Sequence, residues 1–268
     1  MSKAPIGIFD SGLGGLTVLR RIHKLLPNEQ VIYLADSKNC PYGPKTNEEI
    51  IALSERCTQW LLAQGCKMIV LACNTATSSA ISYLRDKYAV PFVGMEPAIK
   101  PAAQFSKTGA VGILATAGTL NGDLYKQTQL QYANHVQVHL QIGTGLVDLV
   151  ESNKLTSPEV ETLLRTYIQP MMDANIDHLV LGCSHYPFLI KTIEKITKKK
   201  EGKTLKIIEP SNAVAQQTKR VLKLNGLLNP SELLKQTLFY TTGDVEKMNA
   251  FLVDVLKIKS AVCTKAIT

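Results

Sequence analysis

The sequence predicts an α/β protein made of two similar lobes, each with a mainly parallel sheet flanked by helices. Short aliphatic runs alternate along the chain with longer helical stretches, which is typical of α/β folds with parallel sheets. Several motifs recur in the same order in the second half of the chain, which indicates an internal duplication. A chain of 268 residues with 45% hydrophobic content can bury one large core or two smaller ones.

In the first half of the chain, four aliphatic runs are expected as strands, and helices are expected between them. The expected strands are Ile6–Phe9, Val31–Leu34, Met68–Ala72 and Pro91–Gly94. The expected helices are Leu16–Leu26, Asn47–Gln64 and Ala76–Lys87. Asn74 or Thr75 can cap the last of these helices, because short amide and hydroxyl side chains accept from free backbone amides.

The second half continues the same alternation. Its expected strands are Val111–Ala115, Val136–Leu140, His178–Gly182, Leu205–Ile208 and Thr237–Tyr240. Its expected helices are Val147–Glu151, Pro158–Ala174, Tyr186–Lys198 and Ser211–Leu222. In such folds ligands bind beyond the carboxyl ends of the strands, so polar residues at those ends are the first candidates for function.

Three pairs of segments carry the duplication. In Ile69–Ala76 and in His178–Tyr186, an aliphatic run ends in a small residue followed by a cysteine. The other pairs, at nearly constant spacing, are Ile6–Gly12 with Val111–Gly118 and Glu96–Pro97 with Glu209–Pro210. We therefore expect a first lobe and a second lobe that comprise, respectively, residues 1–94 plus 208–268 and residues 95–207.

Composition and charge make several function classes improbable. The formal net charge of +8 is scattered, and its densest run, Lys195–Lys203, has no aromatic residues among its lysines. Nucleic-acid binding is therefore not expected as the primary role, whereas a positive field would attract an anionic metabolite. The sequence shows no membrane-spanning apolar run and no signal peptide at its start.

The six cysteines have no zinc-ligand spacing, and no export signal accompanies them. Reduced thiols in the cytoplasm are therefore expected rather than disulfides, and no metal site is expected. We interpret three of these cysteines as structural: Cys57, Cys66 and Cys263.

Cys73 and Cys183 are the leading functional candidates, because each follows an expected strand. A thiol at the start of a helix feels the positive end of the helix dipole, which lowers its pKa and favours the reactive thiolate. The alternative for Cys73 is a buried structural cysteine. His185 follows Cys183 by two positions and can shuttle a proton to a thiol or a bound acid, although a structural histidine is the alternative.

The first expected strand ends in Asp10 and Ser11, followed by the glycine-rich turn Gly12–Gly15. Glycines let backbone amides approach an anion at the start of a helix. The turn is not a dinucleotide loop, because Thr17 stands where the G-x-G-x-x-G pattern needs its last glycine. A tight turn that presents Asp10 and Ser11 to a small polar ligand fits the residues better.

Two further segments are ambiguous when judged from their residues alone. Tyr42 and Gly43 follow Pro41 in a turn that either lines a pocket or is only a loop. Glu151 ends an expected helix and by composition would be an ordinary surface carboxylate.

Four motifs in fixed order carry a family resemblance. They are F-D-S-G-L-G-G-L-T at Phe9–Thr17, P-Y-G at Pro41–Gly43, A-C-N-T-A at Ala72–Ala76 and L-G-C-S-H-Y-P at Leu181–Pro187. On these residues the chain resembles the glutamate racemases of the cofactor-independent aspartate/glutamate racemase family, over nearly its whole length. The resemblance implies an active site in the cleft between two lobes. It also implies racemisation of L- and D-glutamate, which supplies D-glutamate for peptidoglycan synthesis.

The resemblance implies a two-base mechanism, in which one of Cys73 and Cys183 removes the α-proton as a thiolate. The other, as a thiol, delivers a proton to the opposite face of the substrate. Asp10 is similar to the residue that assists the first cysteine, and Glu151 and His185 to the pair that assists the second. The implied substrate-binding residues are Asp10, Ser11, Tyr42, Gly43, Asn74, Thr75, Ser184, His185 and, more weakly, Thr116 and Thr119.

The chemistry agrees with these residue types. A carbanion beside a carboxylate is hard to form without a cofactor, so the pocket must surround the substrate with preorganised donors and exclude water. The two thiols must differ in protonation and titrate as a coupled pair. No cofactor is expected: neither pyridoxal phosphate nor a nucleotide nor a metal is required.

The chain departs from the family pattern in two places. The family commonly has Gly-Asp-Thr-Ala-Arg before Pro-Tyr-Gly, whereas this chain has Ala35-Asp36-Ser37-Lys38-Asn39-Cys40. Ser184 stands where threonine is more usual, and its hydroxyl keeps the hydrogen-bonding capacity. The loop change leaves substrate entry and any regulation through this loop open.

Three alternatives remain at this stage. The first is an aspartate or broader amino-acid racemase, the second a thiol redox protein that uses Cys73 and Cys183 as a dithiol, and the third a small-anion binding protein without turnover. The expected partner is a small-molecule substrate, glutamate, and the resemblance makes a homodimer a reasonable expectation.

Overall fold

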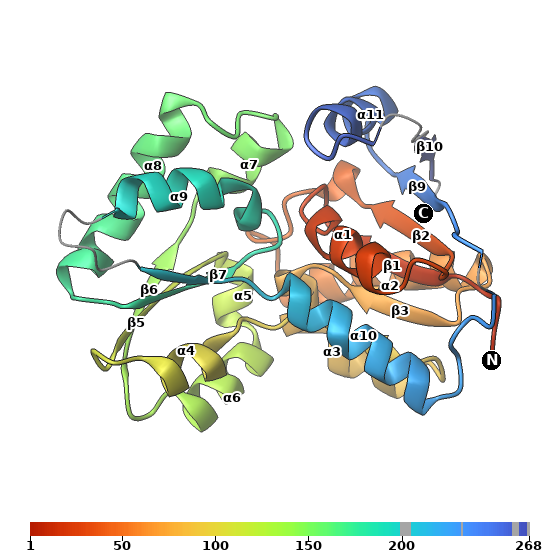
Figure 1. Cartoon of the computed structure of the whole chain (residues 1–268), viewed down its shortest axis with the longest axis horizontal. Helices are drawn as coiled ribbons and strands as arrows, with labels where there is room; N and C mark the ends of the chain where they lie inside the picture. The colour runs from red at the N-terminus through yellow and green to blue at the C-terminus, as the bar shows by residue number, and fades with distance from the viewer. Residues whose placement is uncertain (199–204, 232, 259–262, 267–268) are drawn as a thin grey trace.

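The computed structural model of the chain, which describes residues 1–198, 205–231, 233–258 and 263–266, contains two parallel sheets covered by helices (Figure 1). The first sheet comprises β1 (Ile6–Asp10), β2 (Val31–Ala35), β3 (Met68–Leu71), β4 (Phe92–Val93), β9 (Thr237–Thr241) and β10 (Cys263–Lys265). The second comprises β5 (Ala110–Ala115), β6 (Gln137–Ile142), β7 (His178–Gly182) and β8 (Lys206–Ile208). All paired strands run parallel, which confirms the predicted α/β class.

The helices fill the connections between the strands, as parallel strands require. The α-helices are α1 (Leu16–Leu25), α2 (Asn47–Ala63), α3 (Asn74–Lys87), α4 (Ile99–Phe105), α5 (Ala117–Asn121), α6 (Asp123–Tyr132), α7 (Leu146–Glu151), α8 (Pro158–Asp173), α9 (Ile190–Thr197), α10 (Ser211–Leu224) and α11 (Val245–Asp254). Two short 3₁₀ helices are η1 (Ser37–Asn39) and η2 (Tyr186–Leu189). None of the described helices is long and apolar enough to cross a membrane.

The strand order shows the duplication directly. The first sheet has the order β10-β9-β2-β1-β3-β4 and the second the order β6-β5-β7-β8. The four strands β2-β1-β3-β4 therefore correspond one by one to β6-β5-β7-β8, which confirms two similar lobes. In Figure 1 the elements of the second sheet, yellow to teal, lie to the left, and those of the first, red, orange and blue, to the right.

The C-terminal segment joins the first sheet, because β9 pairs with β2 and β10 pairs with β9. Helix α10 packs against α1 on the same side of the molecule (Figure 1). The largest cluster of buried apolar side chains continues across both sheets, from Ile8 and Val70 to Leu114 and Tyr186. Because this cluster contains residues of both sheets, it does not mark a boundary between the lobes. The expected lobe boundaries, residues 1–94 plus 208–268 and residues 95–207, stay a prediction.

Local signals explain the ends of the clearest helices. Thr46 and Glu49 form a reciprocal capping box at the start of α2, with each side chain accepting from the other residue's backbone amide. Ser157 caps α8 by accepting from the amide of Val160, and Pro158 occupies the first turn.

Several elements escaped prediction: α4, α5, α6, α11 and β10. Helix α6 buries only Tyr125, so its apolar periodicity is too weak to mark it, and α5 and β10 are very short. The predicted helix Tyr186–Lys198 is split into η2 and α9. The basic run Lys195–Lys203 lies partly outside the described residues.

Candidate active site

The functional candidates lie at the point where strand order reverses in each sheet. Strands β1 and β3 occupy this position in the first sheet, and β5 and β7 occupy it in the second. At such a point the connections leave in opposite directions and open a crevice beyond the carboxyl ends of the strands. Asp10 ends β1, Cys73 follows β3, Thr116 follows β5 and Cys183 follows β7.

Residues from both lobes line one small cavity at this crevice. Its lining is Ser11, Pro41, Tyr42, Gly43, Cys73, Asn74, Thr75, Thr116, Val147, Cys183, Ser184 and His185. The centre of a water molecule can occupy only about 10 Å³ of it, which is room for roughly one water. The structure thus brings both candidate cysteines to one enclosed space, while three candidates, Asp10, Thr119 and Glu151, lie behind the lining.

Cys73 is buried and caps helix α3. Its Sγ accepts from the amide of Ala76 at 3.4 Å, and its thiol lies 3.9 Å from Ser11 Oγ. The expectation that Asn74 or Thr75 caps this helix is wrong, because the helix begins at Asn74 and the cysteine itself is the N-cap.

The pKa of Cys73 is raised well above its ordinary value, chiefly by burial and then by the charge of Asp10. The Ala76 amide lowers this pKa, as the helix-dipole argument expects, but burial outweighs it. The expected lowering of the pKa is therefore wrong for this cysteine.

Cys183 has a different environment. It is followed by a turn and η2 rather than by an α-helix, so it does not repeat the helix-capping geometry of Cys73. Its Sγ lies 3.8 Å from His185 Nδ1, and His185 Nε2 lies 2.7 Å from Glu151 Oε1. Cys183, His185 and Glu151 therefore form a chain of contacts, with the histidine ring in the middle.

The histidine and the glutamate stabilise each other's charge. Burial lowers the pKa of His185, but hydrogen bonds with Cys183, Cys40 and Glu151 raise it well above its ordinary value. Burial raises the pKa of Glu151, but its hydrogen bond and ion pair with His185 bring it below its ordinary value. Glu151 Oε1 also accepts from the amide of Leu13 at 2.6 Å, which ties the pair to the first lobe.

Asp10 is completely buried and organises the glycine-rich turn. Its Oδ2 accepts from the amides of Gly12 (3.2 Å) and Gly15 (3.0 Å), and its Oδ1 accepts from Ser184 Oγ at 3.1 Å. The turn amides are thus occupied by carboxylates of the protein, not left open for an anionic ligand. Among the described residues Asp10 makes no hydrogen bond to Cys73, so it acts on that thiol through charge.

The remaining candidates present hydroxyl and amide groups. The hydroxyls of Thr75, Thr116 and Thr119 form a closed triangle with distances of 2.8, 2.9 and 3.2 Å. Asn74 Nδ2 donates to the carbonyl of Met95 at 3.0 Å. Its Oδ1 is buried and has no hydrogen-bond partner in the part of the chain that the structure describes. That oxygen is a ready acceptor for a ligand.

Hydrogen bonds from two side chains to Asp36 stabilise the loop after β2. Tyr42 donates its hydroxyl proton to Asp36 Oδ2 at 2.6 Å, and Thr242 donates to Asp36 Oδ1 at 2.7 Å. The carbonyl of Gly43 accepts from the amide of Gly118 at 2.9 Å, which links the two lobes at the cavity edge. The sequence indicated Tyr42 and Gly43 but not the supporting Asp36 and Thr242.

Sequence reasoning also missed Cys40 and Val147. Val147 lines the cavity from α7. Cys40 lies beside Glu151 and His185, and burial raises its pKa. The one available signal was the altered loop before Pro41, in which Cys40 is the last residue.

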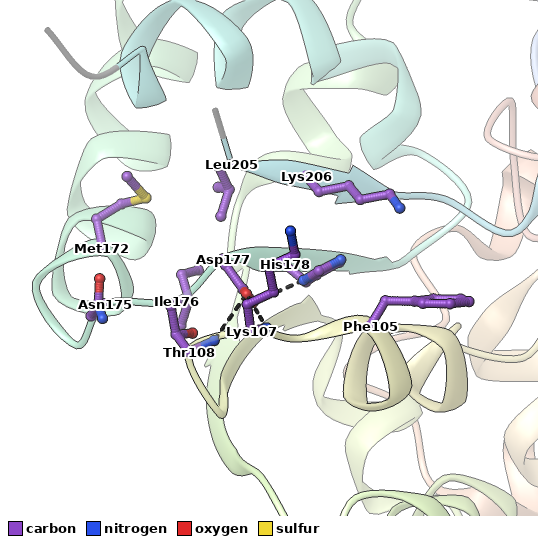
Figure 2. Close-up of a pocket in the computed structure, with 10 residues that line it drawn as sticks. All are labelled: Phe105, Lys107, Thr108, Met172, Asn175, Ile176, Asp177, His178, Leu205 and Lys206. Atoms are coloured by element: carbon purple, nitrogen blue, oxygen red, sulfur yellow. Dashed lines mark hydrogen bonds and ion pairs between the residues drawn. The ribbon is translucent and has the colours of Figure 1, made fainter. Parts of the chain in front are cut away.

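A larger cavity of about 780 Å³ lies elsewhere, at the amino-terminal ends of the second sheet (Figure 2). There the Asp177 carboxylate accepts from the amides of Lys107 and Thr108 and contacts the ring of His178. These hydrogen bonds attach the turn at Lys107 and Thr108 to the start of β7, whereas Cys183 follows the other end of that strand. The cysteines and the cavity they share make the smaller site the candidate active site.

Comparison with known proteins shows which family the chain resembles. The Asp/Glu/Hydantoin racemase family matches residues 6–218 of the chain. A glutamate racemase of Herpetosiphon aurantiacus is 46% identical over 244 residues, covering 91% of this chain and 94% of its own.

Solved structures of similar proteins share the fold over nearly the whole chain. A glutamate racemase from Bacillus anthracis has a TM-score of 0.87 at 29% identity, with 98% of each chain covered. One from Francisella tularensis, in complex with D-glutamate, has a TM-score of 0.85 at 28% identity, with 100% of this chain and 98% of its own covered.

Proposed function

The chain belongs to the Asp/Glu/hydantoin racemase family, and on that premise we propose that it interconverts L- and D-glutamate through Cys73 and Cys183. The observation that carries this proposal is the shared cavity: two buried thiols reach it from equivalent strand ends of the two lobes. A reaction that removes a proton from one face of a carbon and returns one to the other needs groups on both sides.

We infer the starting roles of the two thiols from their environments. Cys73 is a thiol held by burial and by the nearby Asp10 charge, so it is the proton donor in the resting enzyme. Cys183 lies against the ring of His185, which carries a proton because Glu151 supports its charge. A protonated ring stabilises negative charge on a neighbouring sulfur, so Cys183 is the proton acceptor.

The reaction then proceeds by two proton transfers. The Cys183 thiolate takes the α-proton of one glutamate enantiomer and becomes a thiol, while the Cys73 thiol gives its proton to the opposite face and becomes a thiolate. This leaves the two cysteines in the protonation states that the other enantiomer needs. One turnover in each direction therefore returns the enzyme to its starting state.

Polar groups around the cavity hold the substrate. We assign Asn74 Oδ1 to the substrate ammonium, because this buried acceptor has no partner among the described residues. The hydroxyls of Ser11, Thr75 and Thr116, with the backbone amide of Gly43, are donors for the two carboxylates. Ser184 also faces the cavity, but its hydroxyl proton is donated to Asp10. Thr119 positions Thr75 and Thr116, and Asp10 positions Ser184 and the turn.

Substrate entry requires the site to open. A cavity with room for about one water cannot admit glutamate, so the loops that meet at Gly43 and Gly118 must separate and close again. Closure removes water from the carbanion and strengthens each hydrogen bond to it.

Three broader properties belong to the same proposal. We place the enzyme in the cytoplasm, in accord with six free thiols, and in the supply of D-glutamate for peptidoglycan. We expect a homodimer from the family resemblance, which sedimentation velocity tests. We also assign residues 1–94 plus 208–268 and residues 95–207 to separate lobes, which limited proteolysis tests.

The direct test is proton NMR of L-glutamate and L-aspartate, each in D₂O with metal-free and cofactor-free protein, with optical rotation followed in parallel. Loss of the glutamate α-proton signal together with decay of rotation is expected. Loss of the α-proton signal from aspartate alone would make aspartate the substrate in place of glutamate. Loss from neither amino acid would contradict the proposal. A disulfide between Cys73 and Cys183 that forms and breaks reversibly would instead favour the redox alternative.

A further inference from the structure

We propose that this chain binds Zn²⁺ at a site formed by Cys40, Glu151 and His185, and that the bound metal switches the active site off. The binding site stands on the geometry alone, and only its inhibitory effect rests on the proposed function. The sequence indicated no zinc site, because these three residues are far apart in the chain and have no ligand spacing.

The three side chains converge in space. One ligand atom from each, the sulfur of Cys40, a carboxylate oxygen of Glu151 and a ring nitrogen of His185, lie within 4.8 Å of one another. In a tetrahedral zinc site with bonds of about 2.0–2.3 Å, neighbouring ligand atoms are roughly 3.5 Å apart. Small side-chain adjustments therefore complete a three-ligand site, with the fourth position left for water.

The donor set matches zinc rather than calcium or magnesium. Thiolate and imidazole ligands bind Zn²⁺ strongly, while Ca²⁺ and Mg²⁺ prefer sites made of oxygen atoms. His185 is almost completely buried, Glu151 is 9% exposed and Cys40 is half-buried. The cysteine therefore forms the accessible side of the site, through which an ion enters.

The surroundings orient the proposed ligands. A Cβ atom on Gly12 would clash with the Glu151 carboxylate and crowd the Cys40 sulfur, so glycine at this position lets the turn pack closely against both side chains. The amide of Leu13 donates to Glu151 Oε1, and no described residue donates to Oε2. Ser184 Oγ lies 3.2 Å from His185 Nδ1. Such outer contacts orient ligands in metal sites.

Zinc and the proposed proton transfer compete for the same atoms. Zn²⁺ replaces the proton that His185 and Glu151 share and the thiol proton of Cys40, and both protons leave to solvent. With the metal in place His185 and Glu151 no longer share a proton, so the chain of contacts from Glu151 through His185 to Cys183 is interrupted. Cys40 contacts His185 but does not line the cavity that the two active-site thiols share. Its removal should abolish zinc binding, and the activity of each Cys40 variant with zinc is compared with the activity of the same variant without metal.

The test measures metal binding and activity separately. Zn²⁺ affinity is measured by calorimetry and Co²⁺ binding by its thiolate charge-transfer absorption, for wild type, Cys40→Ala and Cys40→Ser. Cys263→Ala is the matched control, because its thiol lies on β10 at the edge of the first sheet. We expect one ion per chain in wild type and control, and a loss of affinity of at least about 100-fold in both Cys40 variants.

Racemase assays with added Zn²⁺ complete the test. Wild type and Cys263→Ala should be inhibited and recover with chelator, while added Zn²⁺ should not change the metal-free activity of either Cys40 variant. Equal affinity and inhibition with and without Cys40 would place the metal on Cys73 or Cys183 and overturn the proposal, as would no binding by the wild type. Binding that needs Cys40 in a protein without racemase activity would keep the metal site and refute the proposed function.

Discussion

At the scale of single residues, the two cysteines differ in what touches them. Cys73 contacts the Ala76 amide and the Ser11 hydroxyl and lies near the charge of Asp10. Cys183 contacts the ring of His185. The two cysteines follow equivalent strands of the two sheets, and we propose that their different neighbours make one thiol the donor and the other the acceptor.

Replacement of either thiol should stop racemisation. Cys73→Ser and Cys183→Ser each remove one proton-transfer group, so kcat should fall by about 10²–10⁴-fold. Circular dichroism measures both directions when the reaction is started once from D-glutamate and once from L-glutamate. Cys66→Ala, a buried cysteine outside the cavity, is the control and should stay within about twofold of wild type. Near-normal turnover in either serine variant would refute the two-base assignment.

Asn74 should contribute to binding rather than to proton transfer. Asn74→Ala removes the free amide oxygen that we assign to the substrate ammonium, which is worth about 1.5–3 kcal/mol for a bond to a charged group. KM should therefore rise by about 10–100-fold, with a smaller change in kcat. Ser82→Ala on the exposed side of the same helix is the control. An unchanged KM for Asn74→Ala would assign the ammonium to another residue.

The His185–Glu151 pair should make stability depend on pH. The pKa of His185 is raised from its ordinary 6.5, so its stabilising contribution is complete below about pH 6.5 and is lost as pH rises through the raised value. The pKa of Glu151 is lowered from its ordinary 4.5, so its contribution is present above about pH 4.5 and is lost as pH falls.

Glu151→Gln tests this dependence. It breaks a buried ion pair, so the free energy of unfolding should fall by about 3–5 kcal/mol near pH 6. The difference from wild type should shrink at alkaline pH, as measured by urea unfolding across the range. A difference that stays constant with pH would mean that the pair is not charged in the folded protein.

At the scale of elements, the turn between β1 and α1 connects the two halves of the site. Its amides bind the carboxylates of Asp10 and Glu151, and its glycines allow close packing against the second lobe. A Cβ on Gly14 would contact the side chains of Ser184 and His185 and the backbone of His185. The sequence showed the glycines but not what they pack against.

Gly14→Ala should therefore impair catalysis more than folding. The added methyl group displaces His185 from Cys183, and a displacement of about 1 Å costs roughly 10²-fold in rate. The free energy of unfolding should fall by about 1–3 kcal/mol, the usual cost of overpacking. Assays of kcat and urea unfolding separate the two effects, with Lys24→Ala on the exposed face of α1 as the control. Full activity in Gly14→Ala would show that this contact does not position the histidine.

Sequence patterns predicted most strands correctly, but they predicted the candidate site only in part. Strands with four or more buried apolar residues were predicted within a residue or two of their observed ends, because aliphatic runs are explicit in the sequence. Helix α6 and strand β10 were missed, since one has a single buried residue and the other three residues. The pKa of Cys73 was predicted in the wrong direction, because burial depends on the whole fold rather than on the local helix.

At the scale of the whole molecule, function depends on how the lobes meet. Each sheet alone brings one cysteine to its carboxyl edge, and the cavity exists only where the two edges face each other. Contacts across this junction include Ser184 with Asp10, Leu13 with Glu151 and Gly118 with Gly43. Motions at the junction should therefore control access of the substrate.

Hydrogen exchange should report this opening. The amide of Gly118, bonded to the carbonyl of Gly43, should exchange faster in the free enzyme than with saturating D-glutamate, because bound substrate favours the closed state. Amides in the centre of β5, such as Ile113, should be slow in both states and serve as the internal reference. Equal exchange at Gly118 with and without ligand would show that entry uses another route.

The central claim, that two different thiols act on opposite faces of the substrate, is tested most directly by the fate of deuterium. L-Glutamate is incubated with the enzyme in D₂O, and the reaction is stopped well before equilibrium. The two enantiomers are then separated, and the deuterium content of each is measured by mass spectrometry. We predict deuterium at Cα in nearly all of the D-glutamate and retained protium in the remaining L-glutamate. Deuterium that enters the remaining L-glutamate as fast as the product forms, or protium carried into the product, would mean that one group serves both faces and would contradict the account.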